Sequence, residues 1–179
     1  MRPMKPDPAI RVQKLRIPTP HGSIPALLLS PKCTPVNATG VLWLHGGGYI
    51  VGMKEMIHMS RAVDLVKKYG AVVLSPGYRL ALQAPYPAAI DDCYASLLHL
   101  KANAAALGVR SDQLMVGGES AGVPAELDVY HSDMHAFDMM RPDDVLSIQA
   151  AEAFNTRFAD AQARFFTPQH EIQEERHDS

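Results

Sequence analysis

Short apolar segments punctuated by Gly, Pro or Asn recur through the first two thirds of the chain, and this pattern predicts β-strands. The first segment alternates, with Val12, Leu15 and Ile17 set among basic residues, as in a half-exposed edge strand. The third and fourth segments are apolar throughout, which is typical of strands covered on both faces of a parallel sheet. The predicted strands are residues 11–17, 24–29, 41–44, 71–75, 113–116 and 125–130.

Between and after these strands the apolar residues recur at helical spacing. Residues 53–69 place methionines and valines on one stripe, and Gly70 is the predicted C-terminal stop of that helix. Residues 88–106 have apolar side chains at i, i+4, i+7 and i+8, which predicts a second amphipathic helix closed by Gly108. The apolar stripe of this second helix consists of Ile90, Tyr94, Leu97 and Leu98. A last helix is predicted over residues 144–166.

The order of these elements predicts the fold class. Strands that alternate with helices indicate an α/β domain with a mostly parallel sheet flanked by helices. We expect one such domain over residues 1–166, followed by a polar, disordered tail over residues 167–179.

Composition excludes several kinds of partner. The 179 residues carry 17 basic and 19 acidic side chains, and this near-neutral balance offers no basic stripe for nucleic acid. No apolar run approaches the roughly 20 residues that a membrane span requires, and the first 16 residues lack the features of a secretory signal. With Cys33 and Cys93 as the only cysteines, we expect a reducing, cytoplasmic location.

A glycine-flanked serine follows the predicted strand that ends near Gly117. The segment is Gly118-Glu119-Ser120-Ala121-Gly122, a G-x-S-x-G motif. Glycines two residues before and after Ser120 allow a sharp turn, because neighbouring backbone can approach where no Cβ intervenes, and the turn exposes the serine Oγ. The motif also occurs by chance, so an inert serine in a glycine-rich loop is the alternative.

A run of three glycines follows the predicted strand 41–44, in the segment His45-Gly46-Gly47-Gly48-Tyr49. Glycines at a strand end allow backbone N–H groups to point into a cleft, where they can stabilise a developing oxyanion. The alternatives are a flexible turn or a phosphate-binding loop, but neither common phosphate-loop motif is present.

With both motifs, the chain resembles the hormone-sensitive-lipase-like branch of the α/β-hydrolase esterases. The resemblance rests on residues 45–49, 78–81, 85–89, 91–92, 118–127 and 135–137. It implies a serine esterase acting on small short-chain acyl esters through an acyl-enzyme on Ser120, with no cofactor or metal. It further implies that His135 is the general base and that the N–H groups of Gly47, Gly48 and Ala121 bind the oxyanion.

The chain departs from this family after the serine. His135 stands only 15 positions after Ser120, whereas the family places further strands and the acidic triad member in that interval. A parallel strand at 125–130 has no room for the crossover of about a dozen residues that it needs. We interpret this short interval as an internal deletion after the nucleophile elbow, the sharp turn that carries Ser120. The triad acid is therefore unknown, with Asp128, Asp133 and Asp138 as unproven candidates.

The shortened sequence leaves other interpretations open. Exposed strand edges and an uncovered sheet face predict self-association. The rival to an impaired esterase is a catalytically dead pseudo-hydrolase that acts, if at all, as a binding or oligomerising module. A metal-dependent hydrolase using His131 and His135, with Asp133 between them, is a third, weaker interpretation.

Two smaller features complete the comparison with the family. Leu82-Gln83 replaces the family's Pro-Glu, a change that we expect to loosen the turn after Ala81. Asp91 and Asp92 are expected to support the start of a helix rather than serve as the triad acid.

Overall fold

The computed structural model describes residues 5–119 and 143–165. The chain divides into two compact units, residues 1–131 and 132–179, and each is described by itself. The second unit contains helix α4 (Val145–Phe165), which confirms the last predicted helix to within a residue at each end. Within the described residues, no helix is long and apolar enough to cross a membrane.

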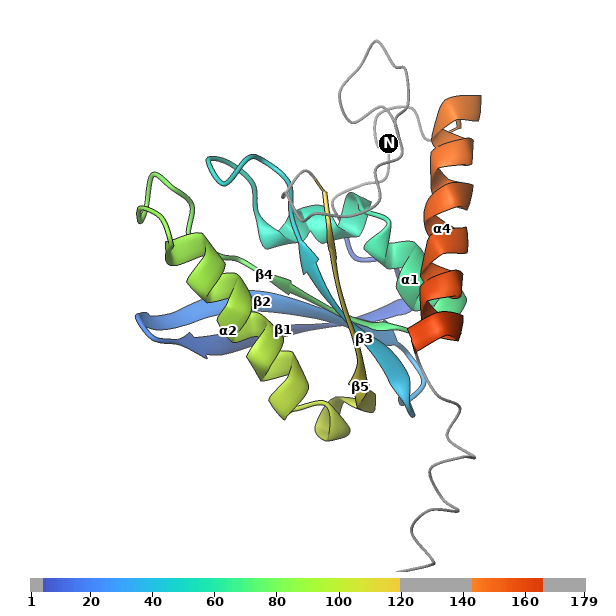
Figure 1. Cartoon of the computed structure of the whole chain (residues 1–179), viewed down its shortest axis with the longest axis horizontal. Helices are drawn as coiled ribbons and strands as arrows, with labels where there is room; N and C mark the ends of the chain where they lie inside the picture. The colour runs from blue at the N-terminus through green and yellow to red at the C-terminus, as the bar shows by residue number, and fades with distance from the viewer. Residues whose placement is uncertain (1–4, 120–142, 166–179) are drawn as a thin grey trace, which may run out of the picture. The chain divides into compact units, whose positions relative to one another are not determined.

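The first unit is built on a five-stranded sheet with the order β1-β2-β4-β3-β5 (Figure 1). β1 pairs antiparallel with β2, and β2 pairs antiparallel with β4, whereas β3 pairs in parallel with both β4 and β5. The α/β class is confirmed, and its parallel part is β4–β3–β5. The strands are β1 (Ile10–Thr19), β2 (Gly22–Pro31), β3 (Ala38–Leu44), β4 (Val72–Pro76) and β5 (Val109–Gly118).

Helices cover both faces of this sheet. Leu28, Leu42 and Leu74 lie in one apolar cluster with Leu100 of helix α2 (Ala88–Ala102). The residues next to them in the strands are equally buried and point to the opposite face, because strand side chains alternate. Helix α1 (Ala62–Tyr69) packs there on β2 and β4. β1 is the exposed edge strand that its alternating pattern predicts, and β4 is buried along its whole length.

The single helix predicted over residues 53–69 is wrong. The segment forms a 3₁₀ helix, η1 (Lys54–Met59), and then α1, with Ser60 in an extended conformation between them. The Ser60 hydroxyl donates to the Ile57 carbonyl at 2.8 Å and accepts the Ala62 N–H at 3.1 Å. A serine side chain that satisfies backbone groups in this way competes with helix continuation. Gly70 ends α1 in the left-handed region, as predicted.

Helix α2 begins at the predicted residue but presents a different side to the sheet. Three members of its predicted apolar stripe are exposed, with 51% of Ile90, 60% of Tyr94 and 48% of Leu98 accessible. The buried side instead carries Ala88, Asp92, Ser96 and Leu100. Burial of the polar pair is possible because both side chains are hydrogen-bonded, with the Ser96 hydroxyl donating to the Asp92 carbonyl at 2.7 Å. α2 ends at Ala102 with Asn103 as its C-cap, and η2 (Ala105–Leu107) leads into the left-handed Gly108.

Candidate functional site

The glycine-rich loop begins where β3 ends at Leu44. Gly47 has a φ of +117°, and a Cβ built on it would lie 2.0 Å from the Val51 carbonyl oxygen. The loop is closed there, because the N–H groups of Ile50 and Val51 both donate to the Gly47 carbonyl at 3.1 Å. Only glycine fits this position, since any side chain would collide with the turn that follows.

Gly48 and Tyr49 continue the loop in the left-handed region, with φ of +59° and +61°. A Cβ on Gly48 would meet nothing within 4 Å, so open space adjoins this residue. Within the part of the chain that the structure describes, the N–H groups of Gly47 and Gly48 have no hydrogen-bond acceptor. Backbone donors next to open space can receive an oxyanion.

His45 anchors the start of the loop inside the protein. Its ring is 2% exposed and stacks on the ring of Tyr78, with centroids 4.1 Å apart and planes 7° apart. The Tyr78 hydroxyl donates to the His45 carbonyl at 2.7 Å, and the His45 Nδ1 lies 2.9 Å from the Gly46 carbonyl. With Nδ1 protonated, both contacts are satisfied, since Tyr78 then gives its proton to the carbonyl.

Burial sets the charge state of this pair. It lowers the pKa of His45, a shift that its hydrogen bond to Gly46 and the charge of Glu55 only partly oppose. Burial also raises the pKa of Tyr78. Both side chains are therefore neutral near pH 7, as suits a structural anchor packed in the apolar interior.

Tyr78 also contacts Tyr49, at the far end of the glycine-rich loop. The rings of Tyr49 and Tyr78 are tilted against each other with centroids 5.8 Å apart. The Ala81 N–H donates to the Tyr49 carbonyl at 2.8 Å, so the segment after β4 supports the loop after β3. Sequence reasoning did not assign this role to Tyr78, although the residue opens the Tyr-Arg-Leu-Ala segment that marks the resemblance.

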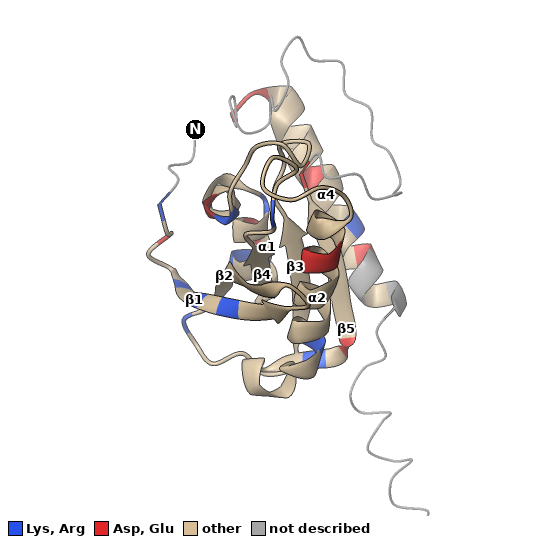
Figure 2. Ribbon diagram, turned by 90° about the vertical axis from the view of Figure 1, so that its left-hand side faces the viewer, with Lys and Arg blue, Asp and Glu red and all other residues tan. Residues whose placement is uncertain are grey.

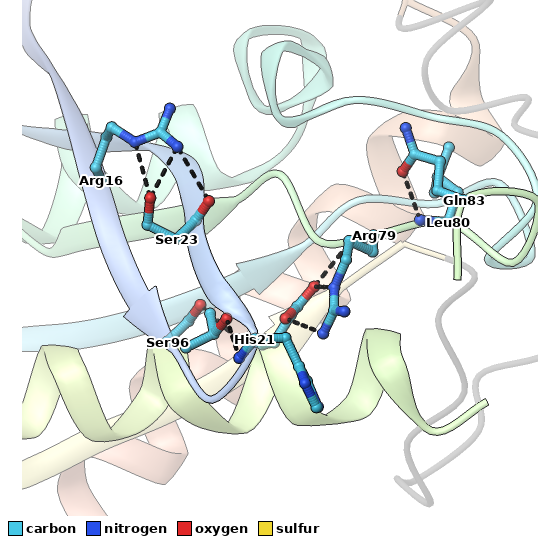
Figure 3. Close-up of polar contacts among 9 residues, drawn as sticks. Arg16, His21, Ser23, Arg79, Leu80, Gln83 and Ser96 are labelled. Carbon is cyan, nitrogen blue, oxygen red and sulfur yellow. Dashed lines mark hydrogen bonds and ion pairs between the residues drawn. The ribbon is translucent and has the colours of Figure 1, made fainter. Parts of the chain in front are cut away.

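An ion pair between the partly exposed Arg79 and a buried aspartate fixes the segment after β4 to α2 (Figure 3). Asp92 is fully buried, and its carboxylate accepts the N–H, Nε and Nη2 of Arg79, each at 2.9 Å. Asp92 thus supports the neighbouring loop rather than capping its own helix, whose start has no side-chain cap. The hydrogen bonds to Arg79 occupy both carboxylate oxygens.

The turn that follows Arg79 is closed, so the loosening predicted from Leu82-Gln83 is wrong. The Gln83 Oε1 accepts the Leu80 N–H at 2.9 Å (Figure 3). The N–H groups of Gln83 and Ala84 donate to the Leu80 carbonyl. A glutamine side chain can satisfy the turn because its amide oxygen reaches the same N–H that a carboxylate would accept.

The strand that precedes the serine motif lies next to β3. Leu44 is in register with Gly118, and a Cβ on Gly118 would lie 2.6 Å from the Leu44 carbonyl oxygen. That same oxygen accepts the Glu119 N–H at 3.1 Å. Because β3 and β5 are parallel, the glycine-rich loop and the first two residues of the serine motif leave the sheet side by side at one edge.

The remaining predicted site residues lie outside the described residues. They are Ser120, Ala121 and His135, together with the acid candidates Asp128, Asp133 and Asp138 and the strand predicted at 125–130. The His131 and His135 pair of the metal interpretation also lies there. Among the residues that the structure does describe, no three His, Cys, Asp or Glu side chains are grouped to hold a metal ion.

Comparisons with known proteins support the fold. Residues 41–126 match the model of a family described as alpha/beta hydrolase fold. This part of the chain has the α/β-hydrolase fold. That match runs from β3 through the whole serine motif, and it therefore includes both segments that meet at the edge of the sheet.

The relatives of this α/β-hydrolase chain include esterases. Esterase LipI of Mycobacterium tuberculosis is 34% identical over 117 residues, which are 64% of this chain and 36% of LipI. Arylacetamide deacetylase-like 3 of Mus musculus is 31% identical over 140 residues, 75% of this chain and 33% of that protein. Among solved structures, the hyperthermophilic esterase of Pyrobaculum calidifontis is 35% identical with a TM-score of 0.57, covering 63% of this chain and 36% of that one. The chain spans about a third of the length of these relatives.

Proposed function

We propose that this chain carries the nucleophile and oxyanion-binding segments of a serine carboxylic-ester hydrolase. The observation that carries the proposal is the hydrogen bond from the Glu119 N–H to the Leu44 carbonyl, which joins the ends of β5 and β3 at 3.1 Å. Ser120 follows Glu119 directly, and His45 follows Leu44 directly. The two motifs therefore start from adjacent points on a parallel pair of strands.

In the proposed reaction, the Ser120 Oγ attacks the carbonyl carbon of a short-chain acyl ester and His135 takes the serine proton. The N–H groups of Gly47, Gly48 and Ala121 stabilise the negative oxygen of the tetrahedral intermediate. The alcohol leaves with the proton held by His135, and water then hydrolyses the acyl-enzyme by the same steps. This proposal involves no cofactor or metal. We keep the cytoplasm as the proposed location on the strength of the cysteine count.

We further propose that the activity is impaired. No carboxylate in the short interval between Ser120 and His135 matches the family's acidic position, so the histidine lacks its orienting partner. Binding and oxyanion contacts alone leave weak catalysis when a triad is incomplete. The alternative proposal is a catalytically dead pseudo-hydrolase, and the same short interval is the observation that favours it.

Covalent labelling tests the two proposals without requiring turnover. A fluorophosphonate ester reacts with an activated serine, and intact-mass and peptide mass spectrometry locate the adduct. We expect labelling at Ser120, loss of labelling in Ser120→Ala, and full labelling in the control Ser111→Ala, whose serine is exposed on β5. Equal, non-selective labelling of all three proteins would contradict the esterase proposal and support the pseudo-hydrolase.

A further inference from the structure

The outer face of α2 carries an apolar strip made of Ile90, Tyr94 and Leu98, here called the α2 strip. These residues are spaced by four, so they lie on one ridge of the helix and extend over about 12 Å at a rise of about 1.5 Å per residue. Each is about half exposed, while the helix buries Asp92 and Ser96 on its inner side. The helix thus exposes large apolar side chains to solvent, while polar side chains lie on the side that faces the sheet.

The other α-helix that the structure describes in this unit, α1, has the usual surface. α1 buries Ala62, Val63, Leu65 and Val66 and turns the charged Lys67 and Lys68 outward. The α2 strip is therefore a particular property of α2, and a helix face of this kind marks an interaction surface.

Charge on α2 is arranged along the helix with opposite signs at its two ends. Asp91 lies in the first turn, and His99 and Lys101 lie in the last turn. Figure 2 shows the acidic start of α2 and the uncharged ribbon that follows it. A partner helix that is complementary to this face should run antiparallel, with a basic end near Asp91 and an acidic end near Lys101. A second α2 meets that description.

We propose that the α2 strip is the contact surface for a second copy of this chain, with the two α2 helices antiparallel about a two-fold axis at Tyr94. In this arrangement Ile90 of each copy faces Leu98 of the other, and Tyr94 packs on Tyr94. The acidic start of each helix lies toward the basic end of the other, and the opposed helix dipoles add to the attraction. A parallel pairing would bring like charges together.

The size of the surface sets the expected strength. The α2 strip itself comprises three large apolar side chains. A standard stable interface uses about 20–30 residues on each side. The contact is thus a weak, reversible one in which the axial tyrosine is the main anchor. It is independent of the esterase proposal, since none of these residues belongs to the catalytic segments.

Cysteine crosslinking tests the register in the full chain. The background is Cys33→Ser, because Cys33 is exposed, while burial raises the pKa of Cys93 to about 12 and keeps that thiol unreactive. In this background we expect Tyr94→Cys to form an intermolecular disulfide on mild oxidation. An equimolar mixture of Ile90→Cys and Leu98→Cys should crosslink with a short bis-maleimide into a dimer that contains one of each. Ile90→Cys alone should yield far less dimer.

Sedimentation velocity provides the matched test without cysteines. Over a roughly hundredfold concentration range the unmodified chain should shift from monomer toward dimer by mass action. Tyr94→Lys should weaken dimerisation by about tenfold or more, since it places two cations on the axis. Val36→Lys, at a residue that is 77% exposed in the loop before β3, should leave dimerisation unchanged. Circular dichroism shows whether the variants remain folded.

The proposal would be overturned by a chain that stays monomeric throughout, by a Tyr94→Cys disulfide yield no higher than that of exposed Cys33 in the unmodified chain, or by equal weakening of dimerisation by Tyr94→Lys and Val36→Lys. Crosslinking of Ile90→Cys with itself in place of the mixed pair would also overturn it, because it would show a parallel register.

Discussion

The Tyr78 hydroxyl donates a hydrogen bond to the His45 carbonyl at 2.7 Å, and the two rings stack with centroids 4.1 Å apart. His45 directly follows β3 and Tyr78 follows β4, so this contact joins the loops that leave two neighbouring parallel strands. It fixes the first peptide of the glycine-rich loop in the interior of the protein. The direction of the following N–H groups depends on that peptide, because the loop turns immediately after it.

Removal of this hydroxyl should destabilise the protein and disturb the loop. Tyr78→Phe keeps the stacked ring but leaves the buried His45 carbonyl without its donor, which should lower the free energy of unfolding by about 1–3 kcal/mol. Tyr94→Phe makes the same chemical change at an exposed site and should stay within about 0.5 kcal/mol of the parent. Urea denaturation measures both. Equal effects would show that the Tyr78 contact contributes nothing particular.

The two central glycines should respond differently to alanine. In Gly47→Ala the new Cβ meets the Val51 carbonyl at 2.0 Å, so the turn must open. In Gly48→Ala nothing lies within 4 Å of the Cβ, and only the left-handed conformation costs energy, about 1–2 kcal/mol. We expect Gly47→Ala to abolish Ser120-dependent hydrolysis and Gly48→Ala to reduce it only partly. Steady-state hydrolysis rates of the two variants, measured at matched folded fractions, test this expectation. A larger loss of activity in Gly48→Ala than in Gly47→Ala would contradict the loop geometry.

The buried carboxylate of Asp92 should contribute more to stability than the exposed carboxylate of Asp112. Asp92→Ala removes three hydrogen bonds of 2.9 Å from a fully buried position and should lower the free energy of unfolding by about 2 kcal/mol. The Asp112 side chain is 58% exposed, so Asp112→Ala, which removes its pair with Arg110, should cost no more than about 1 kcal/mol. Chemical denaturation measures the free energy of unfolding of both variants. A larger loss of stability in Asp112→Ala than in Asp92→Ala would contradict the role given to Asp92.

Stability should fall as the pH is lowered from 7.5 to 5.5. Burial lowers the pKa values of His45 and His58 below their ordinary 6.5, so the unfolded chain binds protons in this range before the folded chain does. Proton uptake by the unfolded state then favours unfolding, and stability present above pH 6.5 is lost as the pH drops toward the folded pKa values. His58→Asn should flatten the dependence of unfolding free energy on pH. If the unfolding free energy of His58→Asn depended on pH as steeply as that of the parent, His58 would make no contribution to the pH dependence.

The parts of the site that sequence could predict are those that depend on short-range constraints. The apolar run 41–44 followed by three glycines predicts a strand that ends in a loop with exposed N–H groups, and the structure has that arrangement because Gly47 cannot carry a side chain. The α/β class follows in the same way from the alternation of apolar strands and helices. The contribution of Tyr78 depends on a contact between residues 33 positions apart, which periodicity alone does not contain.

The sequence-based predictions are wrong where the same local pattern is compatible with two structures. In α2 the large apolar residues Ile90, Tyr94 and Leu98 predict the buried side, yet the Arg79–Asp92 pair turns the opposite side inward. Likewise, the stripe over 53–69 is continuous in hydrophobicity, but the Ser60 hydroxyl takes over backbone hydrogen bonds and divides the segment. In both cases a hydrogen-bonded polar side chain decides the local structure against the apolar pattern. The sequence pattern does not show which polar side chains will find such partners.

The most direct test of the account is the initial rate of p-nitrophenyl butyrate hydrolysis by the purified chain, measured beside an identical preparation of Ser120→Ala. We predict a weak rate above background that the serine variant loses, because the ends of β5 and β3, which lead into Ser120 and the glycine-rich loop, lie side by side. Equal rates for the two proteins would show that this chain has the family's motifs without its chemistry, and would contradict the proposed esterase function.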